Sequence, residues 1–258
     1  MSALDFAALL LAEKRKARRA VAAPAPAPAP EPKQQQRRPP PDAATAARDA
    51  SRPRPALQTL PGAPPTIAYA ADWISEAEEA AIVAAAKRGD DWVTVRGRRL
   101  RRLGGPAGEA GFAPEPLPRW ARDACAAAAA SDPSSSRPAP NHVLVNSYDF
   151  SKESYVLPHT DGPAYDDRTF TLSCGADAVV VFKERLKTSD IGVRAAATRC
   201  EVLLRRRSLV AFSREAYTEC THEIGASPDT IGLCCVNLDA ADARVGDVVG
   251  RAGERVSF

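Results

Sequence analysis

From Asn141 onward the chain loses helical periodicity and breaks into short runs of β-branched and aromatic residues, separated by Gly, Asp, Ser and Pro. Runs of this length and composition, bounded by turn-forming residues, are typical of β-strands. Several short strands in succession favour an antiparallel sandwich or barrel over a parallel α/β sheet. The predicted strands cover residues 142–148, 169–174, 178–182, 200–204 and 208–212.

The stretch before Asn141 has a different pattern. Residues 67–71 alternate as a strand does, and Ser75 followed by three glutamates predicts a helix that ends at Gly89. An arginine-rich strand or hairpin is expected over 92–103, and a second helix over 118–130. The fold class is therefore predicted to be mainly β with flanking helices (α+β).

The N-terminal quarter is low in complexity, and 13 of the 23 prolines precede Thr66. Ala-Pro repeats and a glutamine tract in residues 21–65 bury too little apolar surface to offset chain entropy, so a disordered linker is predicted there. Residues 1–20 are expected to form a short amphipathic helix with a basic end, suited to a protein partner. The folded domain is predicted to span 66–258.

The positive charge of the chain belongs mostly to this tail. Residues 1–55 contain 11 Lys/Arg and 5 Asp/Glu, whereas the whole chain has a net charge of only +3. A strongly basic folded domain is excluded, and any attraction to polyanions must come from local patches.

Membrane insertion and secretion are not expected. The early apolar run over residues 6–12 is far shorter than the ~20 residues of a membrane helix, and it precedes its basic cluster instead of following one. The six cysteines form no C-x-x-C pair and are interpreted as reduced, buried thiols. These features predict a nuclear or cytoplasmic protein, and nothing in the sequence indicates an oligomer, so a monomer is expected.

The residues with the most chemical information are His159 and Asp161. Two residues apart in an extended segment, they project to one face and can bind the same metal. An H-x-D tripeptide is common by chance, but His222 follows 63 residues later and supplies a second imidazole if its strand lies alongside. Two histidines and one carboxylate form the facial triad of non-haem Fe(II) oxygenases, which leaves coordination positions open. His142, at the start of a strand, is interpreted as structural.

A second group of residues suits a carboxylic acid. Asn146 and Tyr148 lie on one face of a predicted strand, and both can donate a hydrogen bond to a carboxylate. Arg255 begins a predicted terminal strand, and its guanidinium can bind a carboxylate in bidentate fashion. The alternative for Arg255 is a solvated residue near the chain end.

Three ordered motifs now resemble a known family: Asn141–Tyr148, Leu157–Tyr165, and Arg207–Val210 followed by His222–Ile224. They are similar to motifs of the AlkB-type Fe(II)/2-oxoglutarate-dependent dioxygenases, in particular the sixth eukaryotic AlkB-homologue subfamily. Residues 65–75 and 97–105 are similar in the same order, so the resemblance covers about 65–258.

The resemblance implies a double-stranded β-helix, or jelly roll. It implies His159, Asp161 and His222 as iron ligands, contacts to 2-oxoglutarate from Asn146, Tyr148 and Arg255, and no further catalytic residue. The implied cofactors are Fe(II), 2-oxoglutarate and O2. The implied reaction is oxidative demethylation of alkylated bases, with release of formaldehyde, CO2 and succinate.

One departure concerns the C-terminus. The family pattern places another arginine six residues after Arg255, and this sequence ends at Phe258. The terminal strand is therefore expected to be truncated, with reduced activity as one interpretation.

The substrate side is predicted from five arginines within residues 96–102. Arg98, Arg99 and Arg101 are expected to contact the phosphates of alkylated DNA or RNA, and Tyr165 to hold the base. A solvated strand face is the alternative for the cluster. For the whole chain, the alternatives are a protein side-chain hydroxylase or demethylase with the same metal chemistry, and a catalytically impaired jelly-roll binding module.

Overall fold

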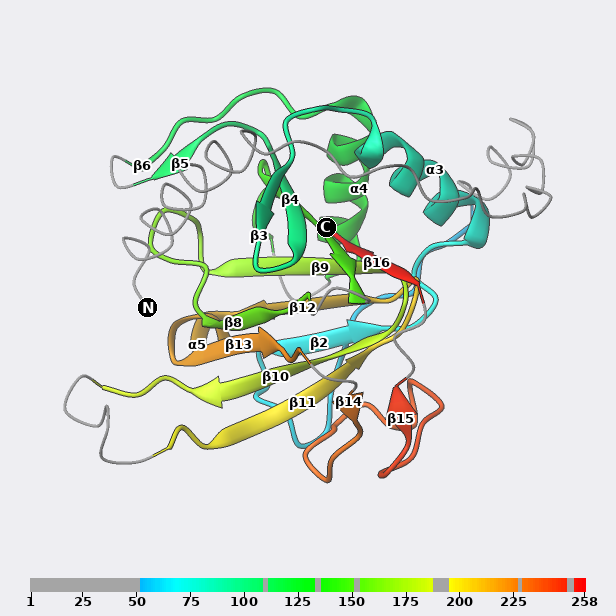
Figure 1. Ribbon diagram of the computed structural model, residues 1–258, viewed down its shortest axis with the longest axis vertical. Helices are drawn as coiled ribbons and strands as arrows, with labels where there is room; N and C mark the ends of the chain where they lie inside the picture. The colour runs from blue at the N-terminus through cyan, green and yellow to red at the C-terminus, as the bar shows by residue number, and fades with distance from the viewer. Residues whose placement is uncertain are drawn as a thin grey trace, which may run out of the picture.

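The computed structural model describes residues 52–108, 111–132, 136–150, 154–187, 195–226, 229–249 and 253–258. Within these ranges the chain forms a larger and a smaller antiparallel sheet, together with three helices. Figure 1 shows three layers, with helices α3 and α4 on one side of the large sheet and the small sheet on the other. This arrangement is a jelly roll, so the predicted fold class is confirmed.

The large sheet has eight strands, and strands far apart in sequence lie next to each other in it. Its order is β1 (Gln58–Thr59), β2 (Ile67–Ala70), β12 (Leu209–Ser213), β9 (Arg168–Gly175), β16 (Glu254–Ser257), β7 (Val143–Asp149), β4 (Arg98–Leu103) and β3 (Val93–Val95). The terminal strand β16 therefore pairs on both edges, with β7 and with β9.

The small sheet has the order β11 (Thr198–Leu204), β10 (Ala178–Glu184), β13 (Cys220–Ile224) and β8 (Val156–His159). Two further hairpins stand apart from both sheets. They are β5 (Ala107–Gly108) with β6 (Gly111–Phe112), and β14 (Asp229–Thr230) with β15 (Val248–Val249).

The helices begin and end where local chemistry predicts. In α3 (Glu76–Lys87), the Ser75 hydroxyl accepts a hydrogen bond from the Glu78 amide, and the Glu78 carboxylate accepts one from the Ser75 amide. Gly89 follows the helix, as predicted, and the Arg101 guanidinium packs directly against it. The other helices are α4 (Arg119–Ala130), which starts after Pro118, and α5 (Arg214–Thr218).

Alternation along the strands gives the large sheet two different faces. On β9, Phe170 and Leu172 point toward α3 and α4, where they join an apolar core with Trp73. The intervening Thr171 lines a cavity between the two sheets. The site described below lies on this second face.

The six cysteines are free thiols, and five of them are buried. Burial raises the pKa of Cys125 to about 11 and that of Cys200 to about 12. The buried thiols therefore stay protonated at neutral pH and pack as small apolar side chains, as predicted. Cys234 is exposed, so the prediction that all six are buried is wrong at this position.

The folded part begins earlier than the predicted boundary at residue 66. Strand β1 pairs with β2, and the flanking Leu57 and Leu60 are buried. Their apolar surface anchors a segment that its proline content had suggested to be linker. The predicted helix over residues 1–20 and the linker up to residue 51 lie outside the described residues. Among the described helices, none has the length and apolar character to cross a membrane.

Candidate metal centre and co-substrate cavity

The structure brings His159, Asp161 and His222 together. His159 ends β8 and lies directly opposite His222 of β13, with 4.3 Å between the ring centroids. Asp161 follows two residues after His159, and its Oδ1 lies 3.8 Å from Nε2 of His159 and 3.6 Å from Nε2 of His222. The strand pairing between β8 and β13 thus closes the gap of 63 residues in the sequence.

Neighbouring groups orient these side chains. Nδ1 of His159 lies 2.9 Å from the Leu157 carbonyl oxygen, so Nδ1 carries the proton and Nε2 keeps its lone pair. The Thr169 hydroxyl donates to Oδ2 of Asp161 at 2.8 Å, which leaves Oδ1 facing the histidines. The Tyr217 hydroxyl donates to the Gly162 carbonyl oxygen at 2.9 Å and thereby holds the loop that contains Asp161.

Both histidines are held neutral. Burial lowers the pKa of His159, and burial together with the charge of His159 lowers the pKa of His222 to about 4. A neutral imidazole presents the lone pair that a metal needs, so the ligand atoms are available without loss of a proton at pH 7.

This donor set fits a non-haem ferrous ion. One ligand atom from each of the three residues lies within 4.8 Å of the other two. Two imidazole nitrogens and one carboxylate oxygen on one side match the facial arrangement of Fe(II) oxygenases. Nothing from the chain is needed on the opposite side, where the co-substrate and O2 bind in such sites.

The three residues predicted to bind a 2-oxo acid lie together on the cavity face. Arg255 is opposite Tyr148 across the β16–β7 pair, and Ser257 is opposite Asn146. The Arg255 side chain is fully buried, lies over the Tyr148 ring at 5.1 Å, and donates to the Ser173 hydroxyl at 3.0 Å. It is a buried strand residue, not a solvated one near the chain end.

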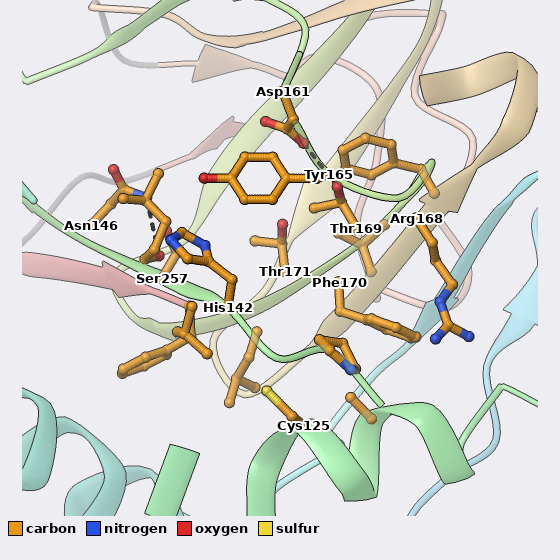
Figure 2. A pocket seen from close by; sticks show the side chains of 18 of the residues that line it. Cys125, His142, Asn146, Asp161, Tyr165, Arg168, Thr169, Phe170, Thr171 and Ser257 are labelled. Carbon is orange, nitrogen blue, oxygen red and sulfur yellow. Dashed lines mark hydrogen bonds between the residues drawn. The ribbon is translucent and has the colours of Figure 1, made fainter. Parts of the chain in front are cut away.

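The triad and these residues line a single cavity of about 820 Å³. Figure 2 shows Tyr165 in the middle of this cavity, between Asp161 on one side and Asn146 on the other. The cavity also reaches Cys125 on α4, so it extends past the interior of the jelly roll. Its size is within the range of small-molecule sites in proteins.

The structure separates the three arginines that the sequence placed together. Arg98 is buried, lines the cavity and lies opposite Tyr148 on β7. Arg99 is exposed, with its guanidinium over the Trp92 ring at 4.8 Å.

Arg101 does not fit the phosphate role predicted for it. Its guanidinium donates to the carbonyls of Ala86 and Arg88 and pairs with Asp91 at 2.5 Å. It binds the C-terminal end of α3 because odd-numbered residues of this strand face the helices. Counting arginines in the sequence could not show this division between the two faces.

His142 was interpreted as structural, but it lines the cavity. Its ring lies edge-on to Phe112 at 5.4 Å and 5.0 Å from Tyr165. Burial, with a smaller effect of Arg102, lowers its pKa to about 4, so it is neutral at pH 7. The signal was present in the sequence, since residues 142, 144, 146 and 148 share one strand face with the predicted co-substrate residues.

The chain resembles known proteins over most of its length. It is 31% identical over 202 residues to a Danio rerio protein named "Probable RNA/DNA demethylase ALKBH6". The aligned region covers 76% of this chain and 85% of that protein. No family model matches.

Two solved structures are similar at a TM-score of 0.45 each. One is OsALKBH1, at 16% identity over 78% of this chain and 98% of that one. The other is an oxidoreductase of the 2OG-Fe(II) oxygenase family from Burkholderia pseudomallei, at 15% identity. That match covers 74% of this chain and 81% of the other one.

Proposed function

Because the chain belongs to the AlkB-type family of Fe(II)/2-oxoglutarate-dependent dioxygenases, we propose that it removes alkyl groups oxidatively from nucleic acid bases. The observation that carries this proposal is the meeting of two neutral histidines and one carboxylate on the wall of the cavity. In this proposal His159, Asp161 and His222 hold Fe(II). The bound iron supplies the oxidising chemistry from O2 and 2-oxoglutarate.

The chain's own residues then position the 2-oxo acid. Arg255 meets the distal carboxylate as a bidentate partner, in a dry environment where a charge-assisted hydrogen bond is strong. Tyr148 packs against the same guanidinium and contributes its hydroxyl. Asn146, one row further along β7, donates its amide to the carboxylate end nearer the metal.

Orientation of the metal ligands depends on two hydroxyls. Thr169 fixes the Asp161 carboxylate, and Tyr217 fixes the turn that follows it. Outer partners of this kind typically change metal affinity by about 10- to 100-fold.

Alkylated nucleic acid is favoured as substrate for three reasons. The Danio rerio relative is named as an RNA/DNA demethylase. Flat side chains at Phe112, His142 and Tyr165 form one wall of the cavity, suited to an extruded base. Arg96 and Arg99 are exposed on the β3–β4 hairpin, where they can meet phosphates.

The test is turnover with a matched pair of proteins. The Fe(II)-loaded full chain is incubated with 2-oxoglutarate, O2 and oligonucleotides that carry single methylated bases, and formaldehyde and succinate are measured. We expect equal amounts of the two products, and no formaldehyde from the Asp161→Ala variant. Succinate without formaldehyde across DNA and RNA would reject the nucleic-acid substrate and favour a protein side chain. Neither product, together with no iron-dependent binding of 2-oxoglutarate, would favour the binding-module alternative.

A further inference from the structure

Two buried arginines, Arg98 and Arg255, line the cavity, and Arg255 is the one assigned to 2-oxoglutarate. Arg98 is only 6% exposed, and among the described residues no carboxylate lies within ion-pair distance of its guanidinium. It lines the same cavity as His159 and His222. Burying an unpaired charge is costly, so we expect the Arg98 guanidinium to act on a ligand of the cavity, by binding it or by excluding others.

The carboxylates of the cavity are already engaged. Among the described lining residues they are Asp161, Asp166 and Glu223. Asp161 is the proposed iron ligand, and Asp166 is exposed and pairs with Arg137 at 3.8 Å. Glu223 is paired with Lys183. Apart from the exposed Asp166, no described lining carboxylate is left to balance a positively charged base.

A charge count points the same way. Fe(II), Asp161 and the two carboxylates of 2-oxoglutarate together carry one negative charge, and Arg255 cancels it. Of the two buried arginines in the cavity wall, Arg98 is then the one whose charge these groups leave uncancelled. For a cationic base about 7 Å away in an effective dielectric of about 20, this charge disfavours binding by about 50-fold.

The aromatic wall can accommodate an uncharged base. His142 is neutral at pH 7, and one of its ring nitrogens, Nε2, is buried without a hydrogen-bond partner among the described residues. It can therefore exchange a hydrogen bond with an uncharged base while Phe112 and Tyr165 pack beside it.

We propose that the site selects uncharged N-alkylated bases and that Arg98 excludes cationic ones. This inference rests on the proposed function. N6-methyladenine and N4-methylcytosine belong to the uncharged class. N1-methyladenine and N3-methylcytosine, which carry a positive charge at pH 7, belong to the excluded class.

The experiment compares these pairs in single-stranded oligonucleotides of identical sequence, with formaldehyde release measured as kcat/KM at pH 7. We expect the wild-type chain to prefer the uncharged isomer of each pair by tenfold or more. Arg98→Gln should shift the ratio toward the cationic isomer by at least tenfold, whereas Arg98→Lys should keep the wild-type ratio. Arg99→Gln, altered at the exposed neighbour, should weaken binding of both isomers equally.

The wild-type ratio tests the inference without any variant. Equal rates, or a preference for the cationic isomers, would overturn the role of Arg98 and leave the proposed function standing. Formaldehyde from none of the four substrates, with 2-oxoglutarate still consumed, would overturn the proposed function and this inference with it.

Discussion

The two faces of the large sheet are built from the same strands, and at β9 and β16 they differ in chemistry. On the face toward α3 and α4, β9 and β12 present Leu172, Cys174 and Leu209 in a continuous apolar core. On the face toward the small sheet, the alternate positions of β9 and β16 are the half-buried Thr171 and the buried Ser173 and Arg255. On β12 the alternate positions Val210 and Phe212 join a second apolar core. A sheet that needed only stability would be apolar on both buried faces.

This difference separates residues that stabilise the fold from residues that bind. Buried polar groups lose hydration, and a buried guanidinium loses more, so apolar substitutes of similar volume often leave stability unchanged or raise it. The polar side chains of β9 and β16 are therefore expected to serve binding, while the apolar cores on both faces contribute most of the stability. Changes to the polar side chains should therefore alter binding, and changes to the apolar cores should alter stability.

The largest effect is expected at the triad. His159→Ala or Asp161→Ala removes one of three metal ligands and should lower iron affinity by more than about 1000-fold, judged from the contribution of individual ligands to binding. Metal content after gel filtration measures this, with the thermal midpoint of the apo-protein expected to change little. Asp166→Asn, a nearby exposed carboxylate, is the control and should retain iron. Normal iron content in both alanine variants would refute the ligand assignment.

The helix-facing side should respond in stability instead. Ile74→Ala removes a side chain that is 1% exposed, belongs to the helix-facing core and does not line the cavity, and it should lower the free energy of unfolding by about 2–4 kcal/mol. Urea unfolding of the apo-protein measures this. At temperatures where the variant is folded, its affinity for 2-oxoglutarate should equal that of the wild type. A binding defect as large as the stability defect would mean that the two faces are not independent.

Arg255→Met makes the reciprocal test. Loss of the guanidinium should weaken 2-oxoglutarate binding by about 100-fold, because the distal carboxylate would then be buried without its cationic partner. Calorimetric titration of the Mn(II)-loaded protein gives this value without turnover. The free energy of unfolding should stay within about 1 kcal/mol of the wild type or rise, because methionine fills similar volume without charge. Unaltered 2-oxoglutarate affinity would remove Arg255 from the co-substrate site.

The smallest effect is a pH dependence of the apo-protein. The pKa values of His222 and His142 fall from 6.5 to about 4 on folding, so the unfolded chain binds more protons between these values. The stability contribution is therefore complete above pH 6.5 and is lost as the pH falls toward 4, by about 2 kcal/mol in total after allowance for partial exposure. Unfolding at stepped pH measures the slope, and His142→Phe should flatten it. A flat wild-type profile would contradict the neutral state of these histidines.

Local patterns in the sequence were enough for much of the fold. The Ser75 capping box, the strand runs after Asn141 and the extended spacing of His159 and Asp161 depend on neighbours within a few residues, and the structure has each of them. Single residues whose role depends on a distant neighbour were harder. Arg101 binds the end of α3, and His142 lines the cavity, because of where their strands are packed.

By itself, the sequence determined the strand-rich class of the domain and the residue types able to bind iron and a 2-oxo acid, because period and spacing are local properties. Only the tertiary structure decided that β8 pairs with β13, that Arg255 lies in a buried central strand, and that Arg98 and Arg101 point to opposite faces. These outcomes depend on pairing between strands far apart along the chain, and the packing of the whole domain selects that pairing.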